Sequence, residues 1–329
     1  MRVLVAGGAG YIGSVVTAAL LAEGHEVTVL DDLSTGHADA VPAGARFVEV
    51  SLHDSAPVLA DVRPEAVLHF AAKSLVGASQ EQPEDYWHTN VGGTLALLEA
   101  MRAADCRRIV FSSTAATYGE PDAIPIREDA PTRPTNTYGA SKLAVDAMLT
   151  SYAVAHGFAA VSLRYFNVAG AAFGLGERHA TETHLIPIAL QVAAGQRESM
   201  TVFGEDYPTP DGTCIRDYIH VSDLAAAHVA ALEWLIAHPQ DNLTINCGYG
   251  QGLSVLEVLD AVDRINGRAV PRETGPRRAG DPPMLVAANA ALLRTLDWRP
   301  SHADIDRIVT DALAWERTLA ERVPEPTLT

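Results

Sequence analysis

The sequence is poor in positive charge and especially in lysine. Its 329 residues carry 24 basic and 41 acidic side chains, for a net charge of −17, and only two of the basic residues are lysines, Lys73 and Lys142. Surfaces that bind polymeric phosphate depend on clustered lysine and arginine. We therefore expect no nucleic acid among the partners of this chain.

Cysteines are also few, and no apolar run is long. Cys106, Cys214 and Cys247 are scattered, without the paired spacing of a zinc or redox site, which favours reduced packing residues and indicates no metal site. No apolar stretch approaches the length of a membrane span, and the first residues lack the cleavage pattern of a signal peptide. We expect no membrane partner and a cytoplasmic location.

Short apolar runs alternate with longer amphipathic stretches through the first half. The runs begin at Val3, Val27, Phe47, Ala66 and Ile109, and each is short enough for a buried strand. The segments 11–23, 84–104 and 138–155 have the pattern of helices between them. Strand–helix alternation predicts parallel strands with helical crossovers. The expected fold class is therefore α/β: a doubly wound, parallel-sheet Rossmann domain with a smaller α/β substrate-binding lobe.

The alternation ends after residue 167, where loops rich in glycine and proline begin. We predict a Rossmann domain over 1–167 and a lobe over 168–329 that mainly binds substrate. Within the second part, residues 219–247 have the pattern of a helix followed by a strand. This piece is expected to pack back on the Rossmann sheet.

A glycine-rich turn follows the first predicted strand and opens a helix. Gly7, Gly10 and Gly13 have the spacing that permits a tight turn and close approach of backbone to a pyrophosphate. Glycines there could also serve only for close packing. Asp31 ends the second strand 18 residues beyond Gly13, where a carboxylate can accept hydrogen bonds from a ribose. Together they predict a dinucleotide site, and the acidic pair Asp31-Asp32 favours NAD over NADP, whose extra phosphate it would repel.

Tyr138 and Lys142 lie four residues apart at the start of a predicted helix, so their side chains share one face. An exposed amphipathic pair is the alternative. An ammonium and a positively charged nicotinamide ring would favour the phenolate, lowering the pKa of the tyrosine so that it can remove a hydroxyl proton. Thr114 ends the fifth strand, at the edge where open α/β sheets bind ligands, and can orient the reacting alcohol. This pattern predicts the oxidation of an alcohol.

These residues resemble the extended short-chain dehydrogenase/reductase superfamily and, within it, the UDP-glucose 4-epimerases. The resemblance covers nearly the whole chain. It is carried by segments spread along the sequence: Gly7–Ser14, His69–Ala72, Asn90–Thr94, Phe111–Gly119, Tyr138–Lys142, Arg164–Asn167 and Asp211–Val221.

The resemblance implies roles for individual residues. Tyr138 is the expected base, Lys142 its electrostatic partner and ribose anchor, and Thr114 the hydroxyl beside the substrate; these three form the expected catalytic set. The residues expected to bind NAD are Gly7, Gly10, Tyr11, Ile12, Gly13, Asp31, Asp32, Leu33, Ser34, Thr35, Gly36, Ser51, Leu52, Phe70, Ala71, Ala72, Lys73, Ser74, Thr89, Tyr138, Lys142 and Phe166. Those expected to bind a UDP-sugar are Thr114, Tyr138, Asn167, His184, Leu185, Thr201, Phe203, Arg216 and Arg278.

The implied activity is the NAD-dependent interconversion of UDP-galactose and UDP-glucose. The sugar is transiently oxidised to a 4-keto form, rotates, and is reduced on its opposite face. Alternatives are a UDP-N-acetylhexosamine 4-epimerase, a net dehydrogenase, a 4,6-dehydratase and a catalytically silent NAD-binding scaffold. The dehydratase is disfavoured because Ala115 and Ala116 stand where its pattern has a carboxylate for the proton transfers of elimination. The scaffold is disfavoured because it would not need Tyr138 and Lys142.

A homodimer is the expected assembly. The helices predicted at 84–104 and 138–155 could form a two-fold, four-helix interface, as they do in relatives.

Overall fold

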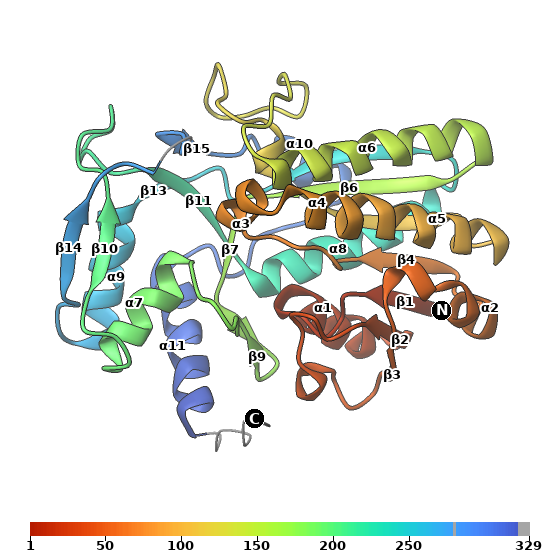
Figure 1. Ribbon diagram of the computed structural model, residues 1–329, viewed down its shortest axis with the longest axis horizontal. Helices are drawn as coiled ribbons and strands as arrows, with labels where there is room; N and C mark the ends of the chain where they lie inside the picture. The colour runs from red at the N-terminus through yellow and green to blue at the C-terminus, as the bar shows by residue number, and fades with distance from the viewer. Residues whose placement is uncertain (279–280, 322–329) are drawn as a thin grey trace.

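A computed structural model of the protein describes residues 1–278 and 281–321. Its centre is a seven-stranded parallel sheet of order β12-β6-β5-β4-β1-β2-β3 (Figure 1). The strands are β1 (Arg2–Ala6), β2 (Glu26–Asp31), β3 (Arg46–Glu49), β4 (Ala66–His69), β5 (Arg108–Thr114), β6 (Ala159–Tyr165) and β12 (Asn242–Cys247). The strand order reverses between β1 and β4, as in a doubly wound sheet. The predicted fold class is confirmed.

Helices cover both faces of this sheet (Figure 1). Because side chains alternate along a strand, Val3 and Val5 pack toward α1 and α8, whereas Leu4 and Ala6 pack toward α5 and α6. Both faces of the inner strands are therefore buried, which explains their nearly continuous apolar sequences. These helices are α1 (Tyr11–Ala22), α5 (Gly93–Ala103), α6 (Thr137–His156) and α8 (Val221–Ala237), with the short α2 (Ala56–Val62) beside α5.

A second apolar core lies in the other half of the molecule and joins α7, α9 and α11 (Figure 1). Strand β11 runs through this region, paired with β7, β13 and β15, and β10 pairs with β14. The helices of this half are α7 (Leu185–Ala193), α9 (Val255–Asn266) and α11 (Ile305–Glu321), whereas α10 (Ala290–Thr295) packs against β12 of the central sheet. The strands are β7 (Asn167–Ala169), β8 (Ala171–Ala172), β9 (Leu175–Gly176), β10 (Met200–Phe203), β11 (Ile215–His220), β13 (Gly252–Ser254), β14 (Arg272–Gly275) and β15 (Met284–Leu285).

The prediction of one continuous helix over 84–104 is wrong in detail. The segment after α3 (Val76–Glu81) consists of α4 (Pro83–Tyr86), a π-helical turn η3 (Trp87–Gly92) and α5. π-turns that interrupt α-helices are frequent at functional sites. Here the turn carries Asn90, whose buried side chain holds the loop after β4, as described below.

Two further expectations bear on packing and membranes. The three cysteines are buried and free, as predicted. Across residues 1–278 and 281–321, no helix combines the length and the apolar character needed to cross a membrane.

Candidate active site

The glycine-rich turn between β1 and α1 leaves no space for side chains at two of its positions. Gly7 has a φ of +81°, and a Cβ there would lie 2.3 Å from the backbone nitrogen of Ala71. A Cβ on Gly13 would lie 2.1 Å from the carbonyl oxygen of Gly7. Both positions therefore need glycine for the close approach of β1, α1 and the loop after β4.

Gly10 serves another purpose, because it faces open space. A Cβ at Gly10 would meet no protein atom closer than 3.5 Å, so a side chain would occupy the space before the first turn of α1. Gly10 is the N-cap of α1, no side chain caps the helix, and its first turn contains no acidic residue. Free backbone N–H groups and the positive end of the helix dipole suit an anion. The turn thus fits the pyrophosphate of a dinucleotide.

Asp31 lies beside this turn, at the end of β2. Its Oδ2 accepts from the backbone N–H of Ala9 at 3.0 Å and its Oδ1 from that of Leu33 at 2.9 Å. Burial raises the pKa of Asp31, and these hydrogen bonds offset part of the effect. A Cβ on Gly36 would lie 2.9 Å from Oδ1, so the segment folds closely around the carboxylate.

The rest of this segment and the end of β3 extend the same edge. Asp32 Oδ1 accepts from the backbone N–H of Ser34 at 2.9 Å, and Thr35 lines a pocket beside Gly10. The backbone N–H of Val50 donates to the backbone carbonyl of Asp31 at 3.0 Å, which places Ser51 and Leu52 next to the end of β2. The Ser51 hydroxyl donates to Asp54, and Leu52 is buried against Gly93.

The loop after β4 contains Phe70, Ala71, Ala72, Lys73 and Ser74, and it is fastened by Asn90. The Asn90 amide accepts from the Lys73 N–H at 2.8 Å and donates to the Lys73 carbonyl at 3.0 Å and to Ser141 Oγ at 2.9 Å. Asn90 thereby joins the expected cofactor loop to α6, which carries Tyr138. The neighbouring Thr89 is half-buried in η3. Asn90 belongs to one of the segments that carry the resemblance, but no role was predicted for it. A buried amide within an apolar helix pattern is the signal that could have indicated one.

The Lys73 ammonium forms an ion pair with Asp85. This side chain therefore lies on α4. Only the backbone of Lys73 takes part in the bonds to Asn90.

Tyr138 and Lys142 occupy the first turns of α6, opposite the end of β5. Helix α6 begins where Asn136 Oδ1 accepts from the backbone N–H of Gly139 at 2.8 Å. The buried Lys142 donates from Nζ to the carbonyl of Ser112 at 2.8 Å. A side-chain hydrogen bond joins Tyr138 to Thr114. The structure thus brings the three expected catalytic residues to one strand end.

Burial dominates the ionisation of this pair. Burial raises the pKa of Tyr138 to about 12, although the bond from Thr114 opposes it. Burial lowers the pKa of Lys142 to about 7, and Asp146 on the same helix opposes that change. The phenol is therefore not acidic in the protein alone. The lower pKa of Tyr138 that is expected from the sequence therefore requires a positive charge close to its hydroxyl.

Tyr11, Ile12, Phe166 and Asn167 lie where the two halves of the chain meet. The Tyr11 hydroxyl donates to the carbonyl of Gly170 at 2.6 Å, and Ile12 contacts the core beside α1. Phe166 is buried just after β6, and Asn167 begins β7, where it pairs with Tyr218 of β11. These residues bring the carboxyl edge of the sheet up to the second half.

Arg216 and Arg278 extend from that second half. The buried Arg216, on β11, donates to Asp281 and to its neighbouring carbonyl at Ile215, the latter at 2.8 Å. The Arg278 guanidinium lies 4.1 Å from the centre of the Phe203 ring. Thr201 and Phe203 share the exposed face of β10. The sequence does not predict Asp281 as a partner of Arg216, because 65 residues separate the two.

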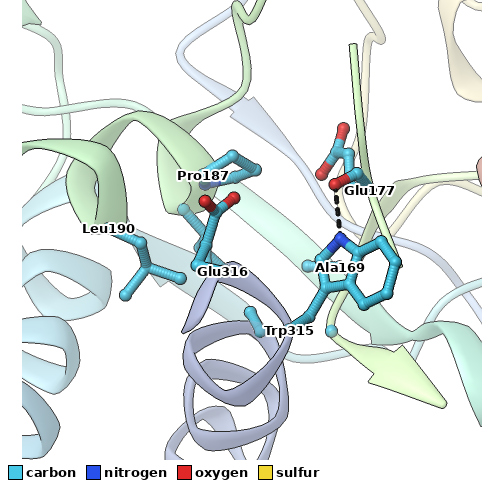
Figure 2. Close-up of a pocket in the computed structure, with 9 residues that line it drawn as sticks. Ala169, Glu177, Pro187, Leu190, Trp315 and Glu316 are labelled. Atoms are coloured by element: carbon cyan, nitrogen blue, oxygen red, sulfur yellow. Dashed lines mark hydrogen bonds between the residues drawn. The ribbon is translucent and has the colours of Figure 1, made fainter. Parts of the chain in front are cut away.

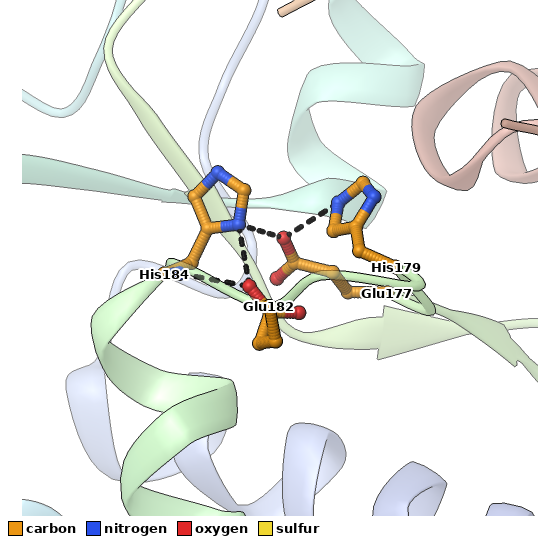
Figure 3. Close-up of side chains that lie close together, drawn as sticks. All are labelled: Glu177, His179, Glu182 and His184. Atoms are coloured by element: carbon orange, nitrogen blue, oxygen red, sulfur yellow. Dashed lines mark hydrogen bonds and ion pairs between the residues drawn. The ribbon is translucent and has the colours of Figure 1, made fainter. Parts of the chain in front are cut away.

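His184 and Leu185 lie at the start of α7, and the His184 ring is directed toward two carboxylates (Figure 3). Its Nδ1 lies 2.7 Å from Glu177 and 2.8 Å from Glu182, and His179 also contacts Glu177 at 3.1 Å. Burial lowers the pKa of His184, but the two carboxylates outweigh it and raise that pKa to about 10. Glu177, His179 and Glu182 were not predicted from the sequence.

The segment that carries this cluster is held against α11. Trp315 Nε1 donates to the backbone carbonyl of Glu177 at 2.7 Å (Figure 2). The Glu182 carboxylate also accepts from the backbone N–H of His184 at 2.8 Å. The members of this cluster therefore bond to one another, and the bond from Glu182 to the backbone of His184 fixes the start of α7.

Comparison with known proteins agrees with this geometry. Residues 3–248 match the NAD dependent epimerase/dehydratase family. The chain is 54% identical to a UDP-glucose 4-epimerase of Corynebacterium glutamicum over 323 residues, which are 98% of each chain.

Solved structures give the same result. The UDP-glucose 4-epimerase of Brucella ovis in complex with NAD has a TM-score of 0.92 and 46% identity, covering 95% of this chain and 97% of that one. The UDP-glucose-4-epimerase of Stenotrophomonas maltophila, with bound NAD and formylated UDP-arabinopyranose, has a TM-score of 0.93 and 40% identity, with coverages of 97% and 99%.

Proposed function

The chain belongs to the NAD dependent epimerase/dehydratase family, and from this premise we propose that it interconverts UDP-galactose and UDP-glucose by inverting C4 of the hexose. It is an NAD-dependent isomerase. The observation that carries the proposal is the meeting of Tyr138, Thr114 and Lys142 at the end of β5, on the same sheet edge as the glycine-rich turn.

Tyr138 is the proposed base for the 4-hydroxyl of the sugar. Thr114 Oγ1 accepts from the backbone N–H of Ala116 at 3.1 Å, so its own hydrogen is free to bond to the phenol or to the substrate hydroxyl. The raised pKa of Tyr138 must fall for the phenolate to form near neutral pH. The Lys142 ammonium, one helical turn away, supplies one of the positive charges that favour it.

The NAD-binding residues fit the proposed role of the edge. The first turn of α1 would hold the pyrophosphate, Asp31 the adenosine ribose, and Lys142 the nicotinamide ribose. When bound, NAD would accept and return a hydride at its nicotinamide ring and would supply the positive charge of that ring. The loop at Phe70–Ser74, which is fixed by Asn90, would form the wall of the cofactor site between the first turn of α1 and Lys142.

The substrate is proposed to be anchored by its diphosphate. Arg216 and Arg278 present forked donors that suit phosphate oxygens, and Asn167, His184, Leu185, Thr201 and Phe203 would complete the nucleotide site. Anchoring through UDP leaves the hexose free to rotate after oxidation. The 4-keto sugar can then be reduced on its opposite face, with Tyr138 returning the proton.

The test is direct conversion. Purified protein incubated with UDP-galactose should produce UDP-glucose without a lasting rise in absorbance at 340 nm. A net dehydrogenase would instead accumulate NADH in proportion to added NAD. Formation of a 4-keto-6-deoxy sugar would identify a dehydratase and contradict the proposal.

We also propose a homodimer through α5 and α6, and a division of roles in which residues 1–167 bind NAD and 168–329 mainly bind substrate. Large apolar side chains are exposed on these helices and on the adjoining η3: Trp87 and Leu95 are each 45% exposed and Val154 is 88% exposed. Such surfaces are typical of interfaces. Light scattering should give twice the mass of one chain, and the mass of a single chain would contradict the dimer.

A further inference from the structure

We propose that Tyr165 and His228 are positioning residues for Lys142, acting through Ser112. They orient the Ser112 hydroxyl so that it presents a lone pair to the Lys142 ammonium. The inference deepens the proposed function, on which it rests, because it concerns the residue expected to hold the nicotinamide ribose and to favour the Tyr138 phenolate.

The residues form a continuous chain of hydrogen bonds from α6 to α8. Lys142 Nζ lies 3.2 Å from Ser112 Oγ. Ser112 pairs with Leu163 of the neighbouring strand β6, so Tyr165, two residues further along, is the next side chain on the same face. There the Ser112 hydroxyl acts on the Tyr165 hydroxyl as a hydrogen-bond donor that opposes the rise of its pKa. The Tyr165 hydroxyl bonds to His228 Nε2, and His228 Nδ1 lies 2.8 Å from the carbonyl of Leu224.

The direction of every bond follows from the last one. A carbonyl can only accept, so His228 Nδ1 carries the hydrogen and Nε2 of the neutral ring must accept. Tyr165 therefore donates to His228, and its oxygen remains to accept from Ser112. With its hydrogen directed at Tyr165, Ser112 Oγ can only offer a lone pair to Lys142.

The side chains in this series are buried, so water cannot replace a hydrogen bond that is lost. The exposed fractions are 0% for His228, 8% for Tyr165, 7% for Ser112 and 3% for Lys142. Burial also lowers the pKa of His228 to about 4, which keeps its ring neutral. The ring packs on Phe70, with 4.8 Å between centroids, so the chain also reaches the expected cofactor loop.

Lys142 depends on this arrangement because it has few other partners. The bonds from its ammonium go to the carbonyl and the hydroxyl of Ser112, and its Nζ lies 4.8 Å from the centre of the Phe111 ring. Asp146 on α6 and His69 at the end of β4 interact with it electrostatically. Neither group takes part in the series of hydrogen bonds from Lys142 to Leu224, so variants of Tyr165 leave both interactions in place.

The two-lysine composition permits a direct measurement. Lysine labelled with ¹³C at Cε gives two side-chain signals in the NAD-loaded full-length protein, and Lys73→Arg identifies that of Lys142. Tyr165→Phe frees the Ser112 hydroxyl to turn, which disfavours the ammonium. We expect the midpoint of the Lys142 titration to fall by about one pH unit, a roughly tenfold change in proton affinity.

Two further variants complete the test. Tyr249→Phe removes a hydroxyl that bonds to Asp223 and takes no part in the series of hydrogen bonds to Lys142. It should leave the midpoint of the Lys142 titration unchanged. Ser112→Ala should lower it as Tyr165→Phe does, and the double variant should lower it no further. Ser112→Ala also provides the test if Tyr165→Phe fails to fold.

An unchanged midpoint in a folded Tyr165→Phe or Ser112→Ala protein would overturn the inference. The titration requires no turnover, so its outcome is independent of the assay for epimerisation. A shifted midpoint in a protein that does not convert UDP-galactose would refute the proposed function and leave the positioning role intact.

Discussion

Replacing Asn90 with alanine should loosen the cofactor loop from α6. The side chain is 2% exposed and makes three hydrogen bonds, two to the backbone of Lys73 and one to Ser141. Alanine removes all three without disturbing the charge of the site. The variant therefore tests whether η3 exists to join the loop after β4 to the helix that carries Tyr138.

The magnitude follows from the bonds that are lost. Three hydrogen bonds at about 1 kcal/mol each give about 3 kcal/mol. Lys73 is half-buried, so water can replace part of its bonding, and Ser141 retains its bond to the Tyr138 carbonyl at 2.8 Å. We expect the free energy of unfolding to fall by about 2 kcal/mol, and NAD to dissociate faster.

Chemical denaturation of the variant measures the first effect, and release of NAD into a filtrate measures the second. Asn266→Ala is the matched control, because its amide makes one exposed bond of 3.3 Å to Arg268; it should change stability by less than about 0.5 kcal/mol. If Asn90→Ala is as stable and retains NAD as well as this control, the assigned role is refuted.

Three other perturbations have expected outcomes. Tyr138→Phe should lower kcat about 10²- to 10⁴-fold while the protein remains folded by circular dichroism; undiminished turnover would reject it as the base. Arg216→Lys should raise the KM for UDP-galactose roughly tenfold with little change in kcat, because an ammonium cannot bond to Asp281 and phosphate as a fork does; an unchanged KM would remove Arg216 from the substrate site. Burial, with Glu182 and Glu177 nearby, raises the pKa of Glu316 from 4.5 to about 7, so the stability that its protonated form contributes is present below pH 4.5 and lost as the pH rises through 7. Glu316→Gln should therefore stabilise the protein by about 2 kcal/mol at pH 8 and by much less at pH 5, and equal stabilisation at both would contradict the assignment.

Most of the sheet could be predicted from the sequence because its inner strands are buried on both faces. Apolar runs at Val3, Val27 and Ala66 are local signals, and the residues that follow each strand necessarily meet at one edge. This is why the glycine-rich turn and Asp31 could be placed together. Tyr138 and Lys142 were recognisable as a pair because one helical turn separates them.

Contacts between distant segments could not be predicted in the same way. The pairing of Lys73 with Asp85 and of Arg216 with Asp281 depends on how loops fold back, which no local pattern records. His228 lies within α8, and no local pattern in the sequence marks its partner. Only the tertiary packing of α8 against β6 brings it to Tyr165.

The ionisation of the catalytic pair was likewise outside the reach of the sequence. Spacing predicts that Tyr138 and Lys142 are neighbours, but their pKa values depend on burial, which moves each toward its neutral form. The protein alone therefore keeps the phenol protonated. Formation of the phenolate therefore requires the positive charge that arrives with the cofactor in addition to the Lys142 ammonium.

The central claim is that C4 is oxidised and reduced again by the same hydride, and isotopic labelling tests it most directly. UDP-galactose deuterated at C4 is incubated with the protein in ordinary water, and the product is examined by NMR. We predict UDP-glucose that retains deuterium at C4, with no accumulation of NADH. Loss of the deuterium to solvent would contradict the account.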